Sequence, residues 1–137
     1  MTGCSVIALE VERTFWEKAT ILHAEYHRPR NKPMRARHSR DCYDLCLMAR
    51  DKSVKLAMAD LKLFERVVEF KKTYFHSSWA CYDSARPGSL RLVPPDYRIP
   101  DLKADYRKMQ VMFIEDPPSF DELLEQLRKI EDEINIV

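Results

Sequence analysis

The chain has 137 residues, of which 45% are hydrophobic and 33% are charged, and its formal net charge is +1, as expected for one globular domain with a core. Two glycines against eight prolines argue against a β-sandwich or a phosphate-cradling loop and favour helices joined by proline-containing connections. No apolar run reaches the length of a membrane span, no signal-peptide pattern is present, and the four cysteines form no CxxC pair, so we expect a cytoplasmic protein with reduced thiols and no membrane partner.

The first predicted element is a short strand over residues 5–12, where apolar and other residues alternate loosely. Thr14 followed three residues later by Glu17 forms a capping box, which predicts that a helix starts here and covers residues 14–26. Lys18 lies on the border of the apolar face of this helix rather than opposite it. That face is formed by Phe15, Ala19, Leu22 and Tyr26.

A basic loop follows over residues 27–37, with prolines at positions 29 and 33. Between positions 28 and 40 the chain carries six basic side chains and no acid, a density that can hold phosphates or RNA but is also found in solvated loops. The position of the loop between two helices that carry unusual charges favours the functional interpretation. Its six candidate nucleotide- or RNA-binding residues are Arg28, Arg30, Lys32, Arg35, Arg37 and Arg40.

The second predicted helix covers residues 39–51, and on it Asp41 and Asp44 share one side with apolar residues. Two carboxylates, like Lys18 on the preceding helix, therefore point where apolar side chains point. Unpaired buried charge is costly, so these groups require each other, a ligand or a metal. We expect Lys18 to lie opposite Asp41 or Asp44 on facing helices.

The sequence pattern of the rest of the chain predicts three more helices. Residues 61–75 form a strongly apolar helix that we expect at the centre of the bundle, and residues 102–113 form another. A second capping box, from Ser119 to Glu122, opens the last helix. Between them lie a short helix or turn (53–58) and an irregular stretch (79–95) with a turn at positions 87–88 and an extended piece at 90–93. The fold class is therefore mainly α: a compact bundle of about five helices, with the short N-terminal strand as its one β element.

Five segments stand out when they are taken together and in order: TFWEK (14–18), RDCYDL (40–45), ERVVEFKKTYF (65–75), WACYDSARPGSLRLVP (79–94) and PSFDELLEQLRKIEDEIN (118–135). The motif RDxxDL alone is a weak signal, whereas the ordered set is fairly specific and covers nearly the whole chain. In this order the segments resemble the C-terminal half of the AbiEii/AbiGii nucleotidyltransferase toxin family.

The resemblance implies transfer of a nucleoside monophosphate from an NTP, with Mg²⁺, to an acceptor that in some relatives is tRNA. Family members resemble polymerase-β-type nucleotidyltransferases, whose glycine-serine and paired-acid metal site lies in an N-terminal half that these residues do not contain. Residues 1–137 are accordingly expected to be a single helical domain, the C-terminal part of a toxin in a toxin–antitoxin or phage-defence system. The chain alone is then expected to be inactive and to work with that N-terminal half or with a cognate antitoxin.

Three candidate catalytic residues follow from the resemblance. Lys18 falls where the family has a lysine required for activity, and it grips a phosphate or neutralises charge that develops during phosphoryl transfer. Asp41 and Asp44 match the family's fourth motif imperfectly, because the spacing here is DxxD, and we take Asp41 as the more important. The alternative function is a non-enzymatic helical module that binds RNA or an antitoxin through residues 28–40.

Other motifs carry weaker signals, and we predict no metal ligand. His23 and His27 lie one turn apart, but the glutamate between them is misplaced for a zinc protease helix. The series His38, Cys42 and Cys46 lacks a fourth ligand, so core cysteines are the better interpretation. Gly88-Ser89 has no paired acids after it and is rejected as the glycine-serine motif. Positions 71 and 72 are expected on a helix surface, and Trp79 with Tyr82 in the core.

Overall fold

The computed structural model describes residues 2–50, 59–75, 79–111 and 117–136. In this part of the chain there are five α-helices, two short 3-10 turns and no strand, which confirms the mainly α prediction. None of the described helices combines the length and apolar character needed to cross a membrane. The short helix or turn predicted at 53–58 lies outside the described residues. The elements are α1 (Thr2–Tyr26), α2 (His38–Met48), α4 (Leu61–Tyr74), η1 (Tyr82–Ser84), η2 (Asp96–Arg98), α5 (Ile99–Gln110) and α6 (Phe120–Ile136).

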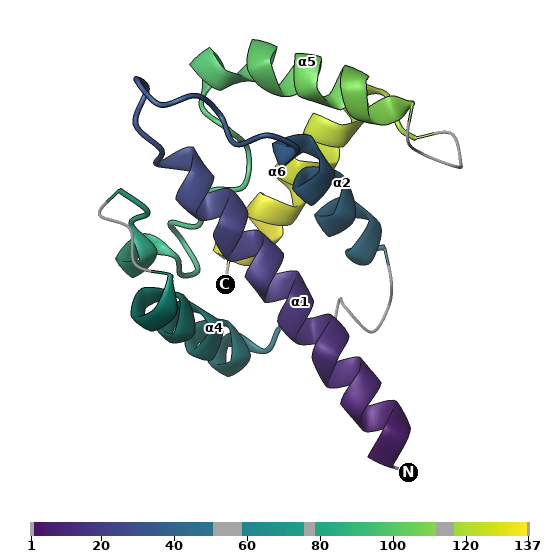
Figure 1. Ribbon diagram of the computed structural model, residues 1–137. Coiled ribbons are helices and arrows are strands. Elements are labelled where there is room, and N and C mark those ends of the chain that lie inside the picture. The colour runs from purple at the N-terminus through teal and green to yellow at the C-terminus, as the bar shows by residue number, and fades with distance from the viewer. Residues whose placement is uncertain (1, 51–58, 76–78, 112–116, 137) are drawn as a thin grey trace.

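The centre of the bundle is α1, and not the helix over residues 61–75 as predicted. Figure 1 shows α1 running across the molecule with α4 on one side and α2 on the other, and α1 contacts both. α4 buries only one face, through Phe64, Val67 and Val68, whereas Phe75 at its end is 54% exposed. Trp16 of α1 stacks on Phe64 with ring centroids 4.1 Å apart, which fixes the α1–α4 contact.

The short strand predicted for residues 5–12 is wrong, because α1 already begins at Thr2 and continues through Thr14. Instead of closing a capping box, Glu17 accepts a hydrogen bond from Arg13 at 3.0 Å, an i,i+4 pair typical of a helix interior. No proline interrupts this segment, and Val11 packs against the core. The predicted end of the helix at residue 26 is confirmed.

α6 turns one apolar stripe to the core, and all members of the stripe except Phe120 are buried: Leu123, Leu124, Leu127, Ile130 and Ile134. The capping box that opens α6 is also confirmed, since the amide of Glu122 donates to Ser119 Oγ at 3.2 Å. α5 begins three residues before its predicted start, because Pro100 is tolerated in the first turn of a helix. The cysteines Cys42 and Cys46 are buried in the core, also as predicted.

Residues 79–95 form the predicted irregular stretch, which packs against α1 and α6 without strand partners. The turn at positions 87–88 is confirmed by the φ of 99° at Gly88, a left-handed conformation that glycine adopts without steric penalty. The amides of Leu90 and Leu92 donate to side chains of α6, Asn135 Oδ1 (3.1 Å) and Glu131 Oε1 (2.6 Å). Side chains of α6 thus accept the hydrogen bonds of these backbone amides, a role that a neighbouring strand plays in a β-sheet.

Candidate functional site

A lysine between two aspartates joins α1 to α2. The amine of Lys18 lies 3.0 Å from Asp41 Oδ1 and 3.3 Å from Asp44 Oδ2, which confirms the prediction that these charges face each other. The second oxygen of Asp41 accepts from Arg35 at 2.8 Å, and the second oxygen of Asp44 accepts from Arg40 at 3.2 Å. We call these five residues the Lys18 cluster.

The cluster is partly buried and tightly paired. Side-chain exposure is 26% for Lys18, 10% for Asp41 and 26% for Asp44. Burial disfavours the charged form of Lys18, but hydrogen bonds and the charges of both aspartates outweigh burial, so the pKa of Lys18 is raised. The lysine is therefore held as a fixed cation at the surface between the two helices.

The basic loop between α1 and α2 is fastened at both ends by α5 and the turn before it. Arg98 is 5% exposed and donates to the carbonyls of Pro29 (2.9 Å) and Lys32 (2.6 Å). The carboxylate of Asp105 accepts from the amides of Arg37 (3.0 Å) and Ser39 (2.9 Å) and from the Ser39 hydroxyl. Asp105 thereby caps the N-terminus of α2, where a negative charge is favoured.

Three of the six basic side chains in this segment are neutralised within the protein. Arg28 pairs with Glu25 at 3.0 Å, while Arg35 and Arg40 belong to the Lys18 cluster. The other three, Arg30, Lys32 and Arg37, are exposed and form no ion pair with any described residue. The outward-facing charge of the loop is thus about half of what the sequence count indicates.

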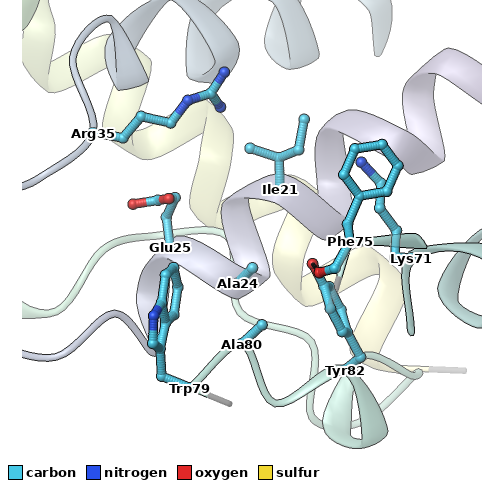
Figure 2. A pocket seen from close by; sticks show the side chains of 9 residues that line it. All are labelled: Ile21, Ala24, Glu25, Arg35, Lys71, Phe75, Trp79, Ala80 and Tyr82. Atoms are coloured by element: carbon cyan, nitrogen blue, oxygen red, sulfur yellow. Dashed lines mark hydrogen bonds between the residues drawn. The ribbon is translucent and has the colours of Figure 1, made fainter. Parts of the chain in front are cut away.

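A pocket of about 270 Å³ lies beside α1 and shares Arg35 with the Lys18 cluster (Figure 2). Trp79 and Glu25 form one side, Phe75 and Tyr82 form the other, and Ala80 lies between them. The sequence placed Trp79 and Tyr82 in the core, but both are only half-buried because they line this pocket. Further lining residues are Ile21 and Ala24 of α1, Arg35 of the cluster, and Lys71 of α4.

Two of the three histidines singled out as weak metal candidates, His23 and His38, are buried. His23 is fully buried, its Nδ1 accepts from the amide of Arg91 (3.0 Å), and its Nε2 donates to the carbonyl of Cys81 (3.0 Å). Burial lowers the pKa of His23 to about 4, although the bond to Cys81 acts in the opposite direction. Burial also lowers the pKa of His38 to about 4. Both rings are therefore neutral at pH 7.

Because these two histidines are neutral when buried, we expect the protein to be less stable at acid pH. A neutral buried histidine takes up its proton only in the unfolded chain between pH 6.5 and 4, so the free energy of unfolding falls as pH decreases through that window. We expect a loss of about 2 kcal/mol for each histidine between pH 7 and pH 5. The measurement is urea unfolding at both pH values; the variant His23→Gln should lose less, and equal stability at pH 7 and 5 would contradict this assignment.

Fold and site together define a helical protein with a fixed lysine–aspartate cluster beside an anchored basic loop. Comparison with protein families identifies it further. The chain belongs to the AbiEii family, because residues 1–126 match the model described as "Nucleotidyl transferase AbiEii toxin, Type IV TA system". Comparisons with curated proteins and with solved structures give no match. The resemblance seen in the sequence is therefore confirmed at the level of the family.

The magnesium ion that this family's chemistry implies does not fit the aspartates of the cluster. Each carboxylate oxygen of Asp41 and Asp44 already accepts a hydrogen bond from Lys18, Arg35 or Arg40. A hard cation requires oxygen ligands directed at it, and these oxygens are directed at cationic side chains. Among the described residues no group of three or more His, Cys, Asp or Glu could hold a metal ion. The two aspartates orient Lys18, and we assign them no metal.

Proposed function

We propose that the Lys18 cluster binds the phosphates of an NTP during nucleotidyl transfer to an acceptor such as tRNA. The observation that carries this proposal is the fixed position of Lys18, whose amine is held by two carboxylates and stays partly exposed. A cation held in place before the reaction can stabilise phosphate charge without rearranging. Lys18 is then the residue that touches phosphate, and Asp41 and Asp44 position it.

The test is incubation of the purified chain with labelled NTPs, magnesium and total tRNA. The chain is assayed alone and joined to any coding segment that precedes it, and NTP binding by the chain is measured in parallel. NTP binding that depends on Lys18, together with label transferred in either form, supports the proposal. A chain that binds no NTP and transfers no label in either form contradicts it.

The anchored basic loop favours a second function, binding of RNA or of an acidic antitoxin surface without catalysis. Arg30, Lys32 and Arg37 are exposed on a backbone that Arg98 and Asp105 hold in place, with Arg30 4.8 Å from the ring of Tyr97 and Lys32 6.0 Å from the ring of Trp79. A ligand that is a polyanion would meet these three charges together. This candidate uses basic residues outside the Lys18 cluster and requires no NTP.

Salt dependence tests the loop. Three phosphate contacts give a slope of log affinity against log salt of about −2.1 to −2.7, so RNA affinity should fall about 20-fold to 40-fold between 50 and 200 mM salt. Replacing Arg30 and Arg37 by glutamate should remove most of this slope in a filter-binding assay. The matched control is the same reversal at Arg128 and Lys129, which are exposed on α6. Equal effects of the two reversals would show that the loop is not the binding surface.

A further inference from the structure

The pocket beside the Lys18 cluster combines aromatic walls with an alanine floor. Trp79 stands on one side and Phe75 with Tyr82 on the other (Figure 2), while Ala24 and Ala80 are nearly or fully buried at its base. Ligand sites of drug size span about 300–1,000 Å³, so a pocket of about 270 Å³ suits one planar ring system rather than a whole nucleotide. Aromatic side chains stack on any nucleobase, because every base has a π-face.

The pocket also contains a cation, the amine of Lys71. Lys71 is half-buried and lies 4.7 Å from the ring of Phe75, but it forms no ion pair with any described carboxylate. The adjacent Lys72 is different, because it pairs with Glu69 at 3.4 Å and with Asp83 at 2.5 Å. Burial lowers the pKa of Lys71 because it disfavours the charged form of the amine, and an anion bound beside the amine would stabilise that charged form. An anionic group of a ligand in this pocket fits that position.

The pocket and the Lys18 cluster are neighbours along α1. Ile21 and Glu25, which line the pocket, lie three and seven residues after Lys18 on the same side of the helix. At 1.5 Å per residue they lie about 5 and 11 Å along the axis from Lys18, a span that a nucleotide covers from its base to its phosphates. Arg35 belongs to both features, since it lines the pocket and pairs with Asp41.

We propose that this pocket seats a nucleobase between Trp79 and the Phe75–Tyr82 wall, with phosphates of the same nucleotide directed toward Lys71, Arg35 and Lys18. The proposal rests on the proposed function of the Lys18 cluster and adds the base subsite to it. The nucleotide is either a free NTP or the terminal nucleotide of a single-stranded RNA, since both offer a base followed by phosphate. Trp79 and Lys71 thereby become binding residues.

The test compares four variants by titration with each of the four NTPs and with a short single-stranded oligoribonucleotide. Trp79→Ala should weaken binding by about 10-fold to 100-fold, because stacking on one aromatic side chain accounts for that much. Trp79→Phe keeps a ring and should stay within a few-fold of the wild type. Lys71→Ala should weaken binding, whereas Lys72→Ala, its neighbour with internal partners, should not. Thermal melts establish that each variant is folded.

Tryptophan fluorescence provides an independent readout, because the chain contains two tryptophans and one of them, Trp16, is fully buried in the core. Saturation with the nucleotide should quench emission in the wild type, and Trp79→Phe should lose this quenching while still binding. Quenching that persists in Trp79→Phe would place the ligand elsewhere.

The outcomes distinguish a free NTP from an RNA terminus as the ligand of the pocket. They also distinguish failure of the base subsite from failure of the proposed role of Lys18. Loss of NTP affinity in Trp79→Ala assigns the pocket to the NTP, and loss of RNA affinity alone assigns it to the RNA terminus; either supports the pocket. If Lys18→Ala weakens binding but Trp79→Ala and Lys71→Ala do not, the base subsite is overturned and the proposed function stands. If only the pocket variants weaken binding, the role of Lys18 is overturned and the subsite stands.

Discussion

Replacement of Lys18 by alanine is expected to reduce nucleotidyl transfer by about 100-fold to 1,000-fold, the range seen when one preorganised charge-stabilising group is removed from an active site. The amine lies between Asp41 and Asp44 and needs no rearrangement to meet a phosphate. The measurement is label transferred to tRNA by the form of the protein that supports transfer, with NTP binding by the 137-residue chain beside it.

The control must separate a loss of transfer activity from a loss of folding stability. Removal of the Lys18 amine leaves the carboxylates of Asp41 and Asp44 close together without the cation between them. The double variant Lys18→Met with Asp41→Asn restores charge balance with side chains of similar size. It should recover much of the thermal stability lost in Lys18→Ala and none of the transfer. Full transfer by either variant would eliminate Lys18 as the phosphate-binding residue.

The aspartates should differ in their effect on stability. Asp41 is 10% exposed and accepts hydrogen bonds from both Lys18 and Arg35, so Asp41→Ala is expected to lower the free energy of unfolding by about 3 kcal/mol. Asp44 is more exposed and pairs with the half-exposed Arg40, so Asp44→Ala should lower it by about 1 kcal/mol. Denaturant unfolding of both variants measures the difference.

That comparison also addresses which aspartate positions the lysine. If Asp41 holds the amine, Asp41→Asn should reduce transfer more than Asp44→Asn at a temperature where both variants are folded. The reverse order in both stability and transfer would make Asp44 the main positioning residue. Equal effects would mean that the two carboxylates share the role, contrary to the burial of Asp41.

Much of the Lys18 cluster was predictable, because the sequence places its charged side chains on or beside the apolar faces of two predicted helices. Lys18 on α1 and the aspartates of α2 required partners, and with one short loop between the helices the simplest partners were each other. The capping box and apolar stripe of α6 likewise determine that helix locally. These features depend on neighbours in sequence, which periodicity can reveal.

The remaining site features depend on contacts between residues far apart in sequence. Arg98 and Asp105 act on backbone groups 66–69 residues away, and no local pattern identifies such a partner. The pocket brings Trp79 against α1 through tertiary packing, so its half-exposed aromatic residues looked like core residues in the sequence. The early start of α1 was missed because Thr14 and Glu17 satisfy the capping pattern within a longer helix.

The anchoring of the basic loop has a consequence for the entropy of binding. A flexible arginine-rich segment loses backbone freedom of about 1–2 kcal/mol for each residue that a ligand orders. Here Arg98 and Asp105 already hold the backbone at Pro29, Lys32, Arg37 and Ser39. Most of that ordering therefore occurs when the chain folds, and if the loop binds phosphates as proposed, η2 and α5 would contribute to the affinity without touching the ligand.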